Sequence, residues 1–144
     1  FTKYLVDTTM AMYDVIEITP FFNLVHVLNH GAAFGFLNDP ETTWQFWFFL
    51  AATLMALGII VFIAKSAPRS STVLFAGLGL ILGGAFGNLV DRIRFRAVVD
   101  FLDFHYAGWH WPAFNVADIA ICTGAFLAAL LLWKAEQPSA ADNT

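Results

Sequence analysis

The segment GGAFGNLVDRIRFRAVVDFLDF, Gly83–Phe104, decides how this chain is built. Its first half ends a long apolar run, and its second half carries acids, arginines and valines. The apolar run leads into Asn88, Asp91 and Arg92, and a further acid, Asp100, follows two valines. An ionisable side chain at membrane depth costs about 2.5–3.5 kcal/mol on insertion scales. An apolar chain that retains ionisable side chains at this depth is therefore expected to need them for its function.

The composition indicates a membrane protein. Of its 144 residues, 59% are hydrophobic and 12% are charged, against about 25% charged in a soluble globular domain. The length suits one domain. The net charge of −4 argues against a nucleic-acid-binding protein, which needs a basic face. The single cysteine, Cys122, excludes an internal disulfide and a multi-cysteine zinc site.

Outward from the opening segment, three stretches are long enough to cross a bilayer, which takes about 20 residues. These predicted spans are residues 44–64, 72–90 and 112–133. Only the third contains a charge, Asp118. Residues 1–13 have helical character but are too short to cross alone, so we expect them to be the end of a first span. Residues 92–111 are expected to be a connection, and residues 134–144 a polar tail.

Two further local patterns predict packing and strand structure. Gly79, Gly83 and Gly87 recur at four-residue spacing, which predicts a face for close helix packing. The run Phe21–Leu28 is rich in β-branched and aromatic residues, which favours a strand. Ala32–Leu37 is expected to form a short amphipathic helix at the membrane surface.

The polar residues near the ends of the spans are the candidates for chemistry. Asn115 and Asp118 have i, i+3 spacing, which predicts a shared helix face. Asp91 next to Arg92 is expected to form an ion pair at a helix end. If Asp100 and Asp118 come together, one of the two must keep a proton, as in the aspartic proteases.

Alternatives to a protease remain open at this stage. Asp100 and Asp118 are also compatible with buried structural acids that pair with Arg94 or Arg96, and their separation in sequence does not decide. A small transporter that uses Asp118 as an ion relay, or a membrane-assembly subunit, would also keep an acid in a span. Asp103 is expected at the surface.

Four strings in order resemble the bacterial lipoprotein signal peptidases, the signal peptidase II family. They are NHGAAFGFL (29–37), GGAFGNLVDRIRF (83–95), VVDF (98–101) and FNVADIAI (114–121), with TKYLV (2–6) before them. The resemblance implies an all-α membrane fold with a small β part. The implied fold is a four-transmembrane-helix bundle, and its first helix is expected to be largely absent from this sequence. Residues 17–40 would form a periplasmic β-cradle and surface helix, and residues 134–144 a cytoplasmic tail, all within one integral membrane domain.

The resemblance also implies roles for individual residues. Asp100 and Asp118 fall on the catalytic aspartates. The residues expected to bind substrate or inhibitor are Asn29, Asn88, Arg92 and Asn115. Asp91 and Gly31 are expected to support the site.

The implied activity is removal of the signal peptide from diacylglyceryl-modified prolipoproteins, by cleavage before the lipidated cysteine. No metal or other cofactor is implied. The expected partners are that substrate, membrane lipids and globomycin-type inhibitors, and the chain is expected to be a monomer. Its place would be the bacterial inner membrane, as a multi-pass protein with its active site towards the periplasm.

Overall fold

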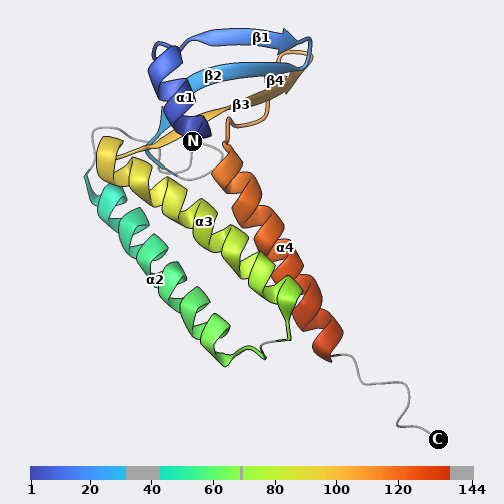
Figure 1. Ribbon diagram of the computed structural model, residues 1–144. Coiled ribbons are helices and arrows are strands. Elements are labelled where there is room, and N and C mark those ends of the chain that lie inside the picture. Colours follow the sequence, from blue (N-terminus) through green and yellow to red (C-terminus); the bar gives the residue numbers. More distant parts are fainter. Residues whose placement is uncertain (32–42, 69, 137–144) are drawn as a thin grey trace, which may run out of the picture.

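A small antiparallel sheet lies at one end of a group of long helices (Figure 1). The computed structural model describes residues 1–31, 43–68 and 70–136. The strands, paired in sequence order, are β1 (Val15–Thr19), β2 (Phe22–Asn29), β3 (Val98–Tyr106) and β4 (Trp109–His110). The helices are α1 (Thr2–Thr9), α2 (Trp44–Ser66), α3 (Thr72–Phe95) and α4 (Val116–Glu136). The predicted combination of apolar helices with a small β part is confirmed.

Two of the three predicted spans have the length and composition of membrane-crossing helices. These are α2 and α3, with mean hydropathies of 2.5 and 2.0 over their best windows. Only 6% of the window in α2 is buried within the protein, so its apolar surface faces outward on nearly all sides. A helix that is hydrophobic all round is typical of one surrounded by lipid.

The third predicted span starts later than expected. Residues 112–133 were predicted, but α4 begins at Val116, and its apolar stretch, Val116–Leu131, is shorter than the other two helices. Backbone hydrogen bonds explain why α4 starts later than predicted. Phe114 exchanges hydrogen bonds with Leu102 of β3, at 2.8 and 3.1 Å, which holds the chain extended until just before the helix.

Helices α3 and α4 approach closely, although not through the predicted glycines. A Cβ atom on Gly79 or Gly83 would meet nothing within 4 Å, and only Gly87 of the predicted set faces α4. The close contacts instead involve Gly77 and Gly84. Seven residues are almost two whole turns of an α-helix, so these two glycines return to one face, whereas four-residue steps drift around it.

The sheet is more extensive than the sequence indicated. The predicted strand at Phe21–Leu28 is confirmed as β2, but β1, β3 and β4 were not predicted as strands. The expected connection at residues 92–111 does lie between α3 and α4, but it has regular structure: α3 continues to Phe95, and the chain then forms β3 and β4. The predicted surface helix at Ala32–Leu37 lies outside the described residues.

The N-terminal helix packs against the sheet. Val6 of α1 and the following Met10 form a buried cluster with Val99 and Phe101 of β3. Helical structure within residues 1–13 is therefore confirmed. This packing also brings Lys3 towards the end of α3, where the polar residues gather.

Candidate active site

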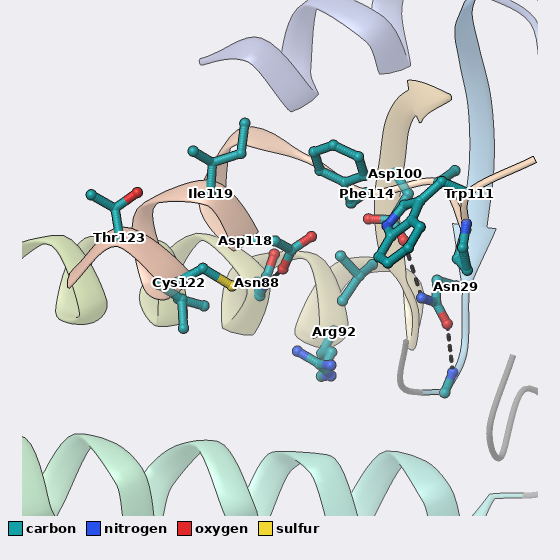
Figure 2. Close-up of a pocket in the computed structure, with 15 residues that line it drawn as sticks. Asn29, Asn88, Arg92, Asp100, Trp111, Phe114, Asp118, Ile119, Cys122 and Thr123 are labelled. Carbon is teal, nitrogen blue, oxygen red and sulfur yellow. Dashed lines mark hydrogen bonds between the residues drawn. The ribbon is translucent and has the colours of Figure 1, made fainter. Parts of the chain in front are cut away.

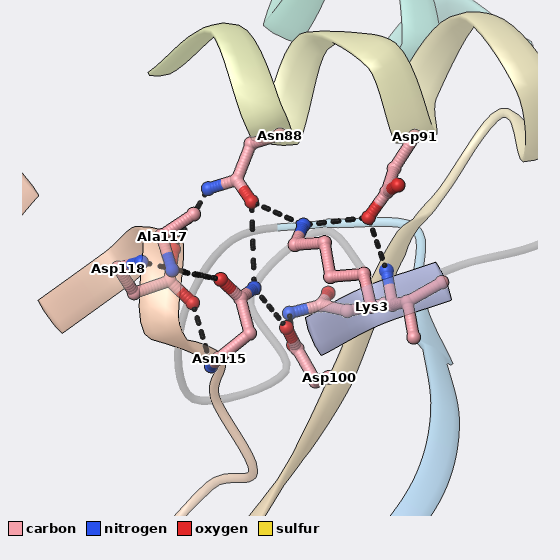
Figure 3. A network of polar contacts seen from close by, with 9 residues as sticks. Lys3, Asn88, Asp91, Asp100, Asn115, Ala117 and Asp118 are labelled. Carbon is pink, nitrogen blue, oxygen red and sulfur yellow. Dashed lines mark hydrogen bonds and ion pairs between the residues drawn. The ribbon is translucent and has the colours of Figure 1, made fainter. Parts of the chain in front are cut away.

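A cavity of about 580 Å³ opens where the end of α3, strand β3 and the start of α4 meet (Figure 2). Six of the eight predicted site residues line it, namely Asn29, Gly31, Asn88, Arg92, Asp100 and Asp118. The other two, Asp91 and Asn115, belong to a polar network beside it (Figure 3). The structure therefore brings the predicted residues together, while their individual roles stay predictions.

Asn115 connects the two acids from the interior. Its Oδ1 accepts hydrogen bonds from the backbone N–H groups of Ala117 (2.8 Å) and Asp118 (3.2 Å). In return, Asp118 Oδ2 accepts one from the backbone N–H of Asn115 at 3.1 Å. This reciprocal pattern is a capping box, so Asn115 caps α4, and the predicted shared helix face is wrong. The Nδ2 of the same amide donates to Asp100 Oδ1 at 2.7 Å (Figure 3).

Asp100 is held on β3 in nearly complete burial, with 3% of its surface exposed. Its Oδ2 accepts a second hydrogen bond, from Asn29 Nδ2 at 3.1 Å. Burial raises the pKa of Asp100 from its ordinary value to about 6, and the nearby charge of Asp118 adds to the rise. The bonds from Asn115 and Asn29 and the charge of Lys3 act in the opposite direction. Asp100 is thus a carboxyl group that keeps its proton up to about pH 6.

Asp118 lies in the first turn of α4 and is joined to α3. Asn88 Nδ2 donates to its Oδ1 at 2.8 Å. The Oδ1 of Asn88 faces the other way, towards Lys3 and, at 3.4 Å, towards Nδ2 of Asn115. The close α3–α4 packing one turn away, at Gly84, is what allows so short a side chain as Asn88 to reach across.

Asp91 pairs with Lys3, and the predicted ion pair with Arg92 is wrong. Lys3 Nζ lies 2.5 Å from Asp91 Oδ2, and the same oxygen accepts a hydrogen bond from the backbone N–H of Val99 at 3.0 Å. Consecutive residues of a helix point about 100° apart, so Asp91 and Arg92 face different neighbours. Asp91 thereby ties α3 to both α1 and β3.

Lys3 is the residue of this network that the sequence analysis missed. Its positive charge could have indicated a role, because the chain has only seven lysines and arginines in all. Lys3 stands within the string TKYLV, which contributed to the family resemblance without a role. Its side chain is 13% exposed, so it is a nearly buried ammonium group.

Arg92 lines the cavity, and its guanidinium makes no salt bridge with the residues that the structure describes. Among the described residues, no carboxylate lies within ion-pair distance of it, and its contact is with the ring of Phe49, 5.3 Å from the centroid. Arg94 instead pairs with Asp7 at 3.6 Å, and Arg96 lies over the ring of Phe46. The alternative in which Arg94 or Arg96 neutralises the two cavity acids therefore finds no support in these contacts.

Asp103 is buried, so its predicted surface position is also wrong. It is 7% exposed, accepts a hydrogen bond from Asn23 Nδ2 at 2.9 Å and lies 2.9 Å from Nδ1 of His110. The pairing of β3 with β2 explains this, since Asp103 lies opposite the buried Asn23. Asp103 therefore links β2 and β4 through these two contacts, and it lies outside the cavity lining.

The rest of the cavity wall is mostly apolar. Trp111, Pro112 and Phe114 form the side next to the sheet, and Ile119, Ile121, Cys122 and Thr123 continue it along α4. Cys122 is a free cysteine on this wall. The cavity thus combines two acids and the guanidinium of Arg92 at one end with an apolar wall that follows α4.

The chain was compared with known proteins and solved structures. Residues 1–134 match the family described as Signal peptidase (SPase) II. The lipoprotein signal peptidase of Oleidesulfovibrio alaskensis is 60% identical over 132 residues, which cover 92% of this chain and 84% of that protein. That of Nitratidesulfovibrio vulgaris is 53% identical over 138 residues, covering 95% and 83%.

A solved structure shows the same fold. It is described as "Bacterial membrane enzyme structure by the in meso method at 2.3 A resolution", has 31% sequence identity and superposes with a TM-score of 0.81. The match covers 96% of this chain and 84% of that one. With the family match over nearly the whole length, this similarity means that the chain belongs to the signal peptidase II family of lipoprotein signal peptidases.

Proposed function

We propose that this peptidase is an aspartic endopeptidase in which Asp100 and Asp118 form the catalytic pair. Its substrate would be a diacylglyceryl-modified prolipoprotein, cut immediately before the lipidated cysteine. The observation that carries the proposal is that both carboxylates line one cavity and both bond to Asn115, Asp100 through the side chain and Asp118 through the backbone.

In the proposed reaction, the two acids share one proton between them. The ionised acid, Asp118, takes a proton from a water molecule, whose oxygen attacks the scissile carbonyl carbon. Asp100 donates its proton to the carbonyl oxygen, which gives a tetrahedral gem-diol. When this collapses, Asp118 passes its proton to the leaving amine and Asp100 recovers one from the hydroxyl, so the pair returns to its starting state.

The assignment of the acid and the base rests on their different surroundings. Burial raises the pKa of Asp100 to about 6, which suits the member that carries the proton. Asp118 instead lies in the first turn of α4, where it accepts hydrogen bonds from Asn88 and from the backbone of Asn115. Two acids whose environments differ in this way are typical of acid and base roles in one site.

Three residues of the cavity lining are proposed to bind the substrate or a globomycin-type inhibitor. They are Asn29, Asn88 and Arg92, whereas the fully buried Asn115 is proposed to hold the two acids in place. The guanidinium of Arg92, free of a salt bridge among the described residues, suits backbone carbonyl groups next to the scissile bond. Gly31 supports Asn29, because its backbone N–H donates to Asn29 Oδ1 at 3.0 Å.

The apolar wall is proposed to accept the lipid-modified part of the substrate. Ile119, Cys122 and Thr123 lead from the acids along α4, which is the direction in which an acyl chain would leave towards the bilayer. We propose that α2, α3 and α4 are three of the four spans of the family's bundle and that the sheet is its cradle at the periplasmic face of the bacterial inner membrane. The enzyme would act there as a monomer among membrane lipids.

The test is cleavage of a diacylglyceryl prolipoprotein by the purified protein, followed as a mobility shift on a gel. We expect Asp100→Asn and Asp118→Asn each to lower the rate on the order of 10⁴-fold, because removing one member disables a unit that works together. Glu17→Gln, on the exposed strand β1, is the matched control and should cut normally. Normal cleavage by either aspartate variant would rule out the pair.

The same preparation tests the transporter alternative. A wild-type protein that dissipates an ion gradient in proteoliposomes but does not cleave the substrate would favour a relay role for Asp118. A wild-type protein that cleaves, with Asp118→Asn inactive and inserted normally, favours the peptidase mechanism.

A further inference from the structure

We propose that Lys3 is a positioning residue for the catalytic pair, one that fixes the orientation of the Asn88 amide so that its N–H faces Asp118. The inference rests on the proposed function, because it assumes that Asp118 acts in catalysis. It assigns a task to a residue that lies outside the cavity lining and would otherwise count as part of a structural ion pair.

The contacts of Lys3 are short and partly buried. Its Nζ donates to Asn88 Oδ1 at 2.6 Å and to Asp91 Oδ2 at 2.5 Å (Figure 3). Its side chain is 13% exposed. An ammonium group can only donate hydrogen bonds, so each atom that it contacts must be an acceptor.

This restriction determines which way the amide of Asn88 points. With Oδ1 bound to the ammonium, Nδ2 must lie on the other side, where it donates to Asp118 Oδ1 at 2.8 Å. Rotating the amide by 180° would place its NH₂ against the ammonium of Lys3 and its carbonyl against the carboxylate of Asp118. Both new contacts would be repulsive, so the positive charge of Lys3 selects the orientation that serves Asp118.

Lys3 also acts through space on Asp100. Its charge opposes the rise in the pKa of Asp100 that burial causes. The charged groups around this end of the site are Asp91 and Arg92 on α3, Asp100 on β3 and Asp118 on α4. Lys3 is the cation from α1 in this group, so its removal changes the charge balance of the acids as well as the amide orientation.

A purely structural role would have different consequences. If Lys3 only neutralised Asp91, its loss would loosen the contact between α1 and α3 and lower the amount of folded enzyme. The activity of the enzyme that does fold would then keep its pH dependence. The positioning role predicts a change in the chemistry of the folded enzyme.

The first experiment compares Lys3→Met with the wild type in steady-state cleavage of a diacylglyceryl prolipoprotein in lipid nanodiscs. We expect kcat to fall roughly 10-fold to 100-fold, as when a residue that orients a catalytic group is removed. We expect KM to stay within about twofold, because Lys3 is not among the described residues that line the cavity. The alkaline limb of the pH–rate profile should move to higher pH, since Asp100 loses a neighbouring positive charge and keeps its proton longer.

The second experiment is a double-mutant cycle with Asn88→Ala. If Lys3 acts through Asn88, Lys3→Met should add little further loss of kcat in the Asn88→Ala background. If Lys3→Met does not accumulate in the membrane, the same cycle is run with Lys3→Arg, which keeps the charge and should retain the wild-type alkaline limb. Lys65→Met, at the exposed far end of α2, is the control and should change neither kcat nor the profile.

The outcomes separate this inference from the proposed function. Fully additive losses in the cycle together with an unshifted pH profile would overturn the positioning role while leaving the aspartate mechanism intact. A wild-type enzyme that does not cleave the prolipoprotein would instead overturn the proposed function.

Discussion

Asp100 shows how strongly a single side chain depends on its surroundings at this site. Its burial raises its pKa to about 6, while the hydrogen bonds from Asn115 and Asn29 hold the rise in check. A carboxyl group that loses its proton near pH 6 is an effective proton donor only below that pH.

The upward shift in the pKa of Asp100 predicts how cleavage depends on pH. In the proposed mechanism Asp100 must be protonated, so kcat/KM should fall as the pH rises through the pKa of Asp100, about 6. Asn29→Ala removes a hydrogen bond that favours the ionised form, so the pKa should rise and the alkaline limb should move to higher pH. Cleavage rates of both proteins in a series of buffers measure this. A limb that moves to lower pH in Asn29→Ala would contradict the acid role of Asp100.

At this scale the sequence predicted which residues gather, but not all of their contacts. Asn29, Asn88, Asp100 and Asp118 were identified together through the resemblance to the signal peptidase II family, whereas spacing alone left the contact between Asp100 and Asp118 open. The partners of Asp91 and Asp103 could not be predicted, since they come from α1 and from β2. Such partners depend on how distant elements pack, which local spacing does not encode.

Among the elements, α3 and α4 matter most, because their separation sets the reach of Asn88 to Asp118. An added methyl at Gly84 would lie 2.8 Å from Cγ1 of Ile121 and against the carbonyl oxygen of Ala117. One helix turn further along α3, Asn88 Nδ2 donates its 2.8 Å hydrogen bond to Asp118 Oδ1. The glycine is therefore needed for the distance between the helices.

A matched pair of substitutions tests this contact. We expect Gly84→Ala to destabilise the protein by about 1–3 kcal/mol through overpacking and to lower cleavage roughly 10-fold, since Asn88 is pushed away from Asp118. Gly83→Ala introduces the same methyl where nothing lies within 4 Å, and it should change the free energy of unfolding by less than about 1 kcal/mol. Thermal unfolding in detergent and cleavage rates measure both effects. Equal losses in the two variants would contradict the assigned packing face.

The glycine pattern also shows what the sequence leaves undetermined about elements. Spacing correctly indicated a close helix contact but selected the wrong face, since several glycines of α3 lie near one another in sequence. Only the position of α4 decides which of them are covered. Similarly, β3 was hidden because both its faces are largely buried, which removes the alternation that identifies a strand.

For the whole molecule, the sheet and the loop between α2 and α3 lie at opposite ends of the helices (Figure 1). If the helices cross the inner membrane as proposed, these two ends are on opposite sides of it. The sequence predicted this arrangement through the ordered motifs. The charges alone did not, because basic residues occur near both ends of the spans.

Cysteine labelling tests the orientation. In a Cys122→Ala background, Glu17→Cys on exposed β1 should react with an impermeant maleimide in cells whose outer membrane has been opened. Ser70→Cys, in the loop before α3, should react only after the inner membrane is permeabilised. Labelling of both positions from the same side would contradict the proposed topology, and the opposite pattern would reverse it.

Asn115 both caps α4 and holds the two acids, and this has a consequence for how the protein is assembled in the cell. One end of its amide starts the last helix and the other end holds Asp100, while its backbone holds Asp118. The two acids are therefore not aligned until that helix has begun. If Asp100 and Asp118 are the catalytic pair, as proposed, a chain whose last helix has not yet formed lacks the aligned pair, and peptidase activity begins only when α4 is in place.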